Sequence, residues 1–241
     1  MSTAASITLH GCYRIAQKTL FEDVALSIPA GQWSCLLGRS GAGKSTILRL
    51  ILGLETAGQF EGTIAAGDAQ PIKGRASYMA QSDLLLPWLS LRENVVLGAR
   101  LRGEKPDLEK ADAMIARVGL TGDHAKKPVA LSGGMRQRAA LARTLMEDRP
   151  IVLLDEPFSA LDAGTRADMQ DLAARVLAGK TVLLVTHDPA EACRLGHHIN
   201  VLSATGVEPW PVPDTAPVRR VDDRGLLNAQ AALLSHLRGA A

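Results

Sequence analysis

Residues 38–45, with the sequence GRSGAGKS, have the composition of a loop that holds phosphate groups. The glycines let successive backbone N–H groups converge on phosphate oxygens, and a helix that begins there points its positive end at the same anion. Lys44 adds a positive charge, Ser45 offers a hydroxyl ligand for Mg²⁺, and Thr46 offers a second hydroxyl. The expected contacts to the nucleotide phosphates are made by Gly38, Arg39, Ser40, Gly41, Ala42, Gly43, Lys44, Ser45 and Thr46.

Residues 131–138, LSGGMRQR, form a second candidate anion site. Ser132 can cap a helix whose first positions are Gly133 and Gly134, so that the helix begins with bare backbone. A glycine inside a helix costs about 1 kcal/mol relative to alanine, which favours a functional reason for two of them at a helix start. A single nucleotide hardly needs two cradles far apart in sequence. The second segment therefore predicts contact with the nucleotide of another copy of the chain.

Two adjacent carboxylates, Asp155 and Glu156, follow the apolar run 151–154. We expect this run to be a buried strand directly beside the strand that carries the glycine loop, with Asp155 orienting a Mg²⁺-bound water near the β and γ phosphates. A second carboxylate at the same place is costly unless it is used, and activation of the attacking water is the obvious use for Glu156. A solvated loop is the alternative, but four apolar residues lead the pair to a sheet edge. The pair and the loop together predict nucleotide hydrolysis.

Apolar runs of strand length indicate an α/β core around these segments. A strand at 33–37 is followed by the glycine loop and by a helix at 46–52, which Gly53 ends. Further continuous apolar runs alternate with helical patterns, as in a doubly wound parallel sheet. These runs cover residues 151–154, 182–185 and 199–202.

His187 is expected at the carboxyl end of one of these strands, immediately before a helix. Asp188 is suited to cap that helix, Pro189 to occupy its first position and Glu191 to reach back to the cap. Taken alone, a histidine in such a position is more often a structural residue than a catalytic one.

Three additions to the core are predicted. Strand-like pieces indicate a small antiparallel sheet, and they cover residues 7–9, 24–28 and 63–65. Helical spacing from Leu91 to about Leu120 predicts an inserted helical subdomain, which we place at about residues 84–147. A C-terminal tail and an amphipathic helix occupy about residues 204–241. The chain 1–241 is thus expected to be one domain.

Composition excludes several classes of function. A formal net charge of +2 with interspersed signs gives no basic field for tracking nucleic acid. Three widely spaced cysteines without metal-ligand spacing fit a reduced cytosolic setting and packing roles. No apolar run approaches the roughly 20 residues that span a bilayer.

From about residue 7 to 202 the sequence resembles the ATP-binding subunits of ABC transporters. In that family 38–45 is the Walker A motif, 151–156 the Walker B motif and 131–138 the signature sequence, here with Met135 where glutamine is most frequent. The resemblance implies a P-loop NTPase with a RecA-like parallel sheet core, an N-terminal antiparallel β subdomain and an inserted α-helical subdomain. It also implies ATP and Mg²⁺ as cofactors and a homodimer that closes around two ATP molecules.

The resemblance also implies roles for single residues. Gln81 would touch Mg²⁺ and the attacking water, Asp162 would lie in the D-loop that crosses the dimer, and His187 would contact the γ-phosphate. The implied catalytic residues are Glu156, His187 and Gln81, the implied metal ligands are Ser45, Gln81 and Asp155, and the implied contacts to the partner's nucleotide are Ser132 and Gly134. For the aromatic that stacks on adenine, Tyr13 is the nearby candidate, although Ile15 can hold the aligned position.

The apolar segment 84–89, LLLPWL, requires a partner surface, either the chain's own core or a helix of another protein. In ABC proteins this region receives the coupling helix of the membrane subunit. The sequence of segment 84–89 resembles that of the ATP-binding subunits of nitrate, sulfonate and taurine importers and of pyrimidine-precursor importers. The resemblance therefore implies a cytoplasmic ATPase, peripheral on the inner face of the membrane, with integral-membrane permease subunits and a substrate-binding protein as partners.

Three other classes of nucleotide-binding protein are alternatives to an importer subunit. A non-transport ABC ATPase of the DNA-repair or translation type usually carries coiled coils or two cassettes, and neither pattern occurs in this sequence. A P-loop kinase or GTPase acting alone would need no second anion site, and the Asn-Lys-x-Asp guanine motif is missing. A nucleotide-binding module without turnover would have no use for Glu156 and His187.

Overall fold

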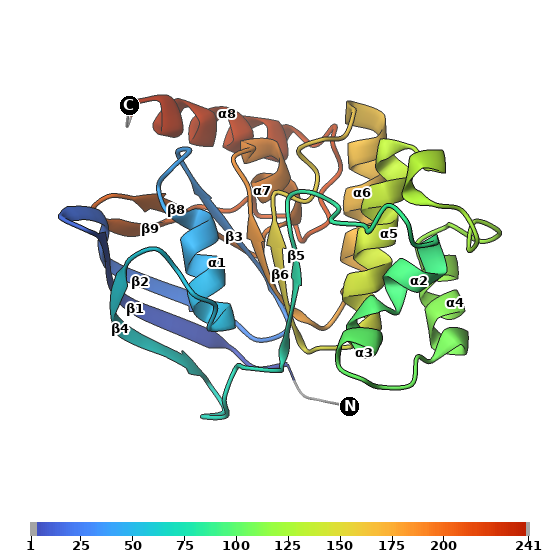
Figure 1. Cartoon of the computed structure of the whole chain (residues 1–241). Coiled ribbons are helices and arrows are strands. Elements are labelled where there is room, and N and C mark those ends of the chain that lie inside the picture. Colours follow the sequence, from blue (N-terminus) through green and yellow to red (C-terminus); the bar gives the residue numbers. More distant parts are fainter. Residues whose placement is uncertain (1–3, 240–241) are drawn as a thin grey trace.

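The larger sheet of this computed structural model has six strands in the order β5-β6-β7-β3-β8-β9 (Figure 1). The structure describes residues 4–239, so residues 1–3 and 240–241 of the expected domain lie outside the described part. The strands are β3 (Trp33–Gly38), β5 (Ala76–Met79), β6 (Ile151–Asp155), β7 (Thr181–Val185), β8 (His198–Ser203) and β9 (Gly206–Trp210). All neighbouring pairs are parallel except β8 and β9. The predicted α/β core is confirmed.

The position of β7 corrects one expectation about this sheet. β3, β6 and β7 are buried at every residue, which explains their continuous apolar sequences. The strand that ends in Asp155 does not lie directly beside the strand that carries the glycine loop, because β7 separates them. Val185 of β7 pairs with Leu36 on one side and with Asp155 on the other. The two functional strands therefore still end at the same edge of the sheet.

A smaller antiparallel sheet, in the order β2-β1-β4, forms the N-terminal part. Its strands are β1 (Ile7–Ile15), β2 (Lys18–Ile28) and β4 (Gln59–Ala66), which confirms the predicted antiparallel sheet. Burial alternates along β1, where Ile7 and Leu9 are buried and their neighbours are exposed. These inward residues share one hydrophobic cluster with helix α1 (Lys44–Leu52) and with β3, β6 and β7 of the larger sheet. The packing fixes the helix that follows the glycine loop against both sheets.

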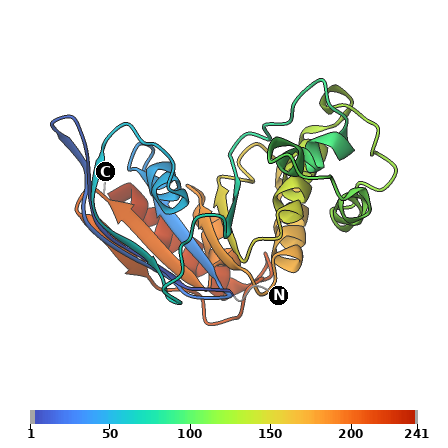
Figure 2. The same ribbon diagram turned by 60° about the horizontal axis from the view of Figure 1, so that its bottom comes forward.

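The chain between β5 and β6 folds into helices, which both views place beyond β5 (Figures 1 and 2). They are α2 (Leu91–Val95), α3 (Leu97–Leu101), α4 (Leu108–Arg117), the short 3₁₀ helix η1 (Pro128–Ala130) and α5 (Gly133–Met146). The helical spacing predicted from Leu91 is thus distributed over short helices, with a break at Val96 between α2 and α3. α2, α4 and α5 pack through buried apolar residues such as Val95 and Ile115.

The C-terminal part returns to the larger sheet. After α6 (Ala163–Val176) and α7 (Pro189–Leu195), the last helix α8 (Arg224–Gly239) buries Leu226 and Leu233. The buried guanidinium of Arg219 donates to the carbonyl oxygens of Cys193, Gly196 and Pro213, which holds the proline-rich tail on the core. No helix within residues 4–239 combines the length and the apolar character needed to cross a bilayer.

Candidate nucleotide site

Two glycines of the phosphate loop occupy positions that exclude a side chain. Gly43, the residue before α1, has a φ of 100°, and a Cβ atom there would lie 3.0 Å from the ring of Phe21. A Cβ atom at Gly38 would lie 2.6 Å from the carbonyl oxygen of Leu202. The backbone at both ends of the loop is therefore held close to neighbouring strands, with its N–H groups near the start of α1.

Lys44 is buried within the loop that it belongs to, with a relative exposure of 6%. Its ammonium nitrogen Nζ donates to the carbonyl oxygens of Gly38, at 2.8 Å, and Arg39, at 3.1 Å. Burial lowers the pKa of Lys44, and the nearby carboxylates of Glu156 and Asp155 oppose this shift. The loop thus holds the positive charge of Lys44 among its own backbone carbonyl groups.

The carboxylate of Asp155 is held at both oxygen atoms by hydroxyl groups. The Ser45 hydroxyl donates to Oδ1 at 3.2 Å, and the Tyr78 hydroxyl donates to Oδ2 at 3.0 Å. Carboxylate and hydroxyl oxygens are hard donors of the kind that Mg²⁺ prefers. Within residues 4–239 no group of three or more His, Cys, Asp or Glu side chains could hold a metal.

Glu156 lies at the centre of the three residues expected to be catalytic. Its φ of 46° turns the chain sharply after the strand, and its N–H donates to the carbonyl oxygen of Val185 at 2.8 Å. The carboxylate oxygen Oε2 accepts from Nε2 of Gln81 at 3.1 Å and lies 3.0 Å from Nδ1 of His187. These side chains border a cavity of about 580 Å³ that also contacts Tyr78 and Asp155.

The signature segment presents an exposed helix start. Ser132 caps α5, as predicted, by accepting from the N–H of Met135 at 3.3 Å. Gly134 faces Thr165 of α6, where a Cβ atom would lie 2.7 Å from the threonine methyl group. Asp162 caps α6 through the N–H of Thr165, and this hydrogen bond lowers the pKa of Asp162. Among the described residues, no hydrogen bond joins Ser132, Gly134 or Asp162 to the phosphate loop of the same chain.

The expectation that Tyr13 stacks on adenine is wrong. The side chain is 1% exposed, its ring stacks on Phe21 at 5.6 Å between centroids, and its hydroxyl accepts from the N–H of Gly58 at 2.6 Å. Both faces of the ring are therefore covered by the core. Ile15, at the end of β1, is 39% exposed.

The helix start after His187 also differs in one detail from the expectation. Asp188 caps α7 through the N–H of Ala190 at 2.8 Å, as predicted. The carboxylate of Glu191 does not reach back to this cap; its Oε2 accepts from the Thr186 hydroxyl at 2.6 Å instead. Glu191 is 3% exposed, with the guanidinium of Arg166 4.0 Å away.

The buried carboxyl of Glu191 leads to a prediction about stability and pH. Burial, with a smaller contribution from Asp188, raises its pKa to about 7, although the Thr186 hydrogen bond and Arg166 oppose the shift. Below the pKa of Glu in the unfolded chain, the carboxyl is protonated in both states and the folded state keeps its full stability. As the pH rises through about 7, the free energy of unfolding falls, because the buried carboxyl resists ionisation while the unfolded chain ionises freely.

We therefore expect Glu191→Gln to remove this dependence, because the neutral amide carries no charge to bury. Between about pH 5 and about pH 8.5, the free energy of unfolding of the wild type should fall by about 2 kcal/mol relative to that of the variant. Urea denaturation of both proteins at the two pH values measures the difference. Parallel pH profiles would contradict the prediction.

One residue of the site was not anticipated from the sequence. Tyr78 lies on β5, three positions before Gln81, and nothing in the local pattern distinguishes its ring from an ordinary half-buried strand residue. Only the pairing of β5 with β6 brings its hydroxyl to Asp155.

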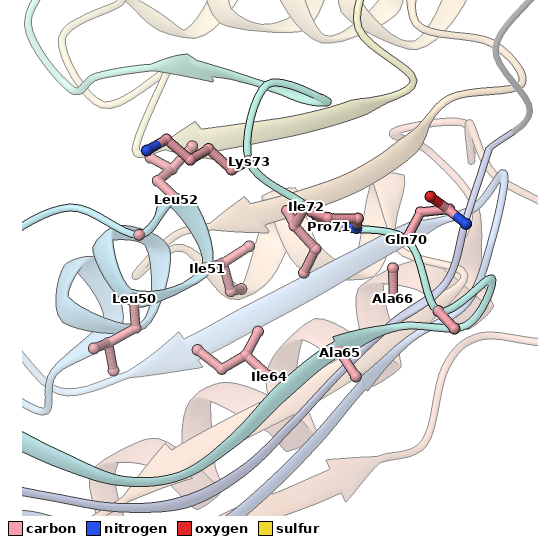
Figure 3. A pocket seen from close by; sticks show the side chains of 12 residues that line it. Leu50, Ile51, Leu52, Ile64, Ala65, Ala66, Gln70, Pro71, Ile72 and Lys73 are labelled. Carbon is pink, nitrogen blue, oxygen red and sulfur yellow. The ribbon is translucent and has the colours of Figure 1, made fainter.

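A cavity of about 390 Å³ at the end of α1 lies away from these residues (Figure 3). Leu50 and Ile51 of α1 face Ile64 of β4 and Ile72 across the cavity. Among the described residues that line it, Lys73 is the charged one. None of the expected site residues borders this cavity.

Comparison with known proteins supports the interpretation of these motifs. Residues 21–159 match the family described as ABC transporter. An uncharacterized ABC transporter ATP-binding protein of Haemophilus influenzae is 44% identical over 92% of this chain and 94% of its own length. The aliphatic sulfonates import ATP-binding protein SsuB of Delftia acidovorans is 39% identical over 98% of this chain and 95% of its own length. The thiamine import ATP-binding protein ThiQ of Mesorhizobium japonicum is 43% identical over 76% of this chain and 77% of its own length.

The fold is similar to a solved structure described as a bacterial Atm1-family ABC exporter with ATP bound. The TM-score is 0.72 at 24% sequence identity, over 86% of this chain and 39% of the exporter chain. At this identity the likeness concerns the fold alone. The matched family and the relatives, together with the order of the motifs around Lys44, Glu156 and His187, lead to one conclusion: the chain belongs to the ABC transporter family.

Proposed function

We propose that the chain is the ATP-hydrolysing subunit of an ABC importer. The observation that carries this proposal is the meeting of Lys44, Asp155 and Glu156 at one sheet edge, with Gln81 and His187 on the Glu156 carboxylate. The names of the sulfonate and thiamine import relatives support the importer role. Release of inorganic phosphate from ATP by the purified chain tests the proposal directly.

Glu156 is assigned as the general base. A carboxylate near the triphosphate can accept a proton from the attacking water. Gln81 and His187 both contact its oxygen Oε2, so they orient the carboxylate and leave Oε1 for the water. With Nδ1 at Glu156, the Nε2 atom of His187 is the atom left to contact the γ-phosphate.

The proposed metal is Mg²⁺, held by Ser45, Asp155 and Gln81. Since Nε2 of Gln81 donates to Glu156, the amide oxygen is the atom that remains for a metal. When bound, Mg²⁺ neutralises charge that develops on the β and γ phosphates. The binding residues fit this ion by their oxygen chemistry.

The base and ribose are proposed to occupy the cavity of about 720 Å³ beside the phosphate loop. Leu20 of β2 borders it on one side, and His236 and Leu237 of α8 border it on another. This site replaces the stacking on Tyr13. Apolar contact with Leu20 and Leu237, beside the imidazole of His236, then takes the place of the tyrosine ring.

A homodimer is proposed to close around two ATP molecules. Ser132 is exposed, and a side chain at Gly133 would meet no atom closer than 4.0 Å, so the start of α5 is open to a ligand from outside the chain. The start of a helix favours anions, because its dipole and its free backbone N–H groups point toward them. Each ATP would be held by the Lys44 loop of one protomer and by the Ser132 end of the other, and Asp162 would lie at the same interface.

The segment after Gln81 is proposed to receive a helix of a membrane subunit. Leu84 is 59% and Trp88 66% exposed, although both are large apolar residues. The backbone beneath them is rigid, because buried Asn94 bonds to Leu86, Leu89 and Ser90. Arg143 of α5 also donates to the carbonyl oxygens of Asp83 and Leu84. A fixed surface with exposed apolar side chains fits a protein partner.

We expect Trp88→Ser to prevent copurification of the co-expressed permease subunits without changing the basal ATPase activity. Tryptophan is enriched among the interface residues whose truncation costs about 2 kcal/mol or more. Leu101→Ser is the matched control, because Leu101 is 79% exposed at the end of α3 and has no place in this surface. Retention of the permease by Trp88→Ser would contradict the assignment. Association of the wild type with ribosomes or DNA instead would favour the non-transport alternative.

The transported compound is proposed to be a small anionic, nitrogen-containing or sulfur-containing molecule, or a thiamine precursor. The support is the naming of relatives for aliphatic sulfonates and thiamine import. The chain would act at the cytoplasmic face of the membrane, beside permease subunits and a substrate-binding protein. Binding of candidate compounds to that substrate-binding protein, followed by thermal shift, tests the substrate class.

A further inference from the structure

Tyr78 reaches the Walker B carboxylate because of the register between two strands. Tyr78 of β5 pairs with Leu153 of β6. Residues two apart in a strand share a face, so Leu153 and Asp155 point to the same side of the sheet as Tyr78. The tyrosine side chain is long enough to reach along this face from the level of Leu153 to that of Asp155, two residues further along β6. Its hydroxyl thereby donates to Oδ2 of Asp155 at 3.0 Å.

We infer that Tyr78 is a positioning residue for Asp155 in the proposed Mg²⁺ site. The carboxylate of Asp155 can rotate about its own bond unless both oxygens are held. Ser45 bonds to Oδ1 and Tyr78 to Oδ2, so the two hydroxyls fix the plane of the carboxylate. If the Ser45 hydroxyl turned to a bound Mg²⁺, the hydrogen bond from Tyr78 would still hold the Asp155 carboxylate. The inference rests on the proposed function of this site.

The tyrosine hydroxyl is suited to act as a permanent donor. The phenol hydroxyl of a tyrosine ordinarily has a pKa of about 10, so it carries its proton near neutral pH and can donate to the carboxylate of Asp155.

The hydrogen bond also joins the two ends of the inserted helical part. β5 leads out through Gln81 into the helices, and β6 begins where the chain returns. Tyr78 and Gln81 lie on the same outgoing segment, while Asp155 and Glu156 end the returning one. Tyr78 contacts Asp155, and Gln81 contacts Glu156. Two side-chain contacts thus align the outgoing and returning segments at the site.

The substitution Tyr78→Phe tests the inference, because it removes the hydroxyl and keeps the ring. Binding of a fluorescent ATP analogue is measured in EDTA and across a titration of free Mg²⁺. We expect unchanged affinity in EDTA and a rise of about tenfold in the Mg²⁺ concentration that gives half of the magnesium effect. The steady-state kcat at limiting Mg²⁺ should fall with it, and excess Mg²⁺ should restore most of the activity.

The chain offers a matched control, since it contains one other tyrosine. Tyr13→Phe makes the same chemical change at a hydroxyl that accepts from Gly58 in the core. It should leave the Mg²⁺ titration unchanged. The inference is overturned if Tyr78→Phe titrates like the wild type, or if it loses affinity equally in EDTA and in Mg²⁺, as a general structural defect would. A wild type that binds no nucleotide would instead contradict the proposed function.

Discussion

Replacement of Glu156 by glutamine is expected to lower ATP turnover by roughly 100- to 10,000-fold, as loss of a general base does. The amide cannot accept a proton from water, yet it has nearly the same size and can still contact Gln81 and His187. The phosphate loop and Lys44 are untouched, so ATP affinity should remain within a few-fold of the wild type. Uncleaved ATP should therefore accumulate between two protomers.

Two measurements check this prediction. Phosphate release gives the turnover, and size-exclusion chromatography with MgATP should show a stable dimer for Glu156→Gln. Glu109→Gln makes the same change at an exposed glutamate in the first turn of α4 and should behave like the wild type. Turnover close to that of the wild type would remove Glu156 from its assigned role. A variant that stays monomeric with ATP would count against the proposed interface at Ser132.

Replacement of Lys44 by alanine should weaken ATP binding itself, by about 10- to 100-fold. The buried ammonium is held by the carbonyl oxygens of Gly38 and Arg39 at the cradle, where it would face the phosphates. A charge-assisted hydrogen bond in a partly dehydrated site contributes more than an exposed ion pair. Hydrolysis should fall as a consequence of lost binding, in contrast to the effect at Glu156.

Isothermal titration calorimetry with ATP measures this effect. Lys73→Ala is the matched control, because Lys73 borders the remote cavity at the end of α1 (Figure 3). The alanine also removes two hydrogen bonds within the loop, so thermal unfolding of Lys44→Ala should be recorded beside its affinity. Unchanged ATP affinity in a folded Lys44→Ala protein would reject the assignment of the loop.

The sequence by itself determined the segments that could do the chemistry. The glycine at 43 is needed by local backbone geometry, because its φ is 100°, and the apolar residues before Asp155 and Glu156 predict a buried strand without knowledge of its neighbours. The caps at Ser132 and Asp188 follow from residues a few positions apart. These features depend on residues that are close together in the sequence, so they can be predicted without knowledge of the fold.

The tertiary structure decided which distant residues meet. It placed β7 between the strands of the loop and of Asp155, buried Tyr13 against Phe21, and joined Glu191 to Thr186 rather than to the helix cap. It also brought Tyr78 to Asp155. Strand order and register are set by long-range packing of side chains, and many orders bury the same apolar runs equally well. A shift of one residue in β5 would turn Tyr78 to the opposite face, so the local pattern could not predict this contact.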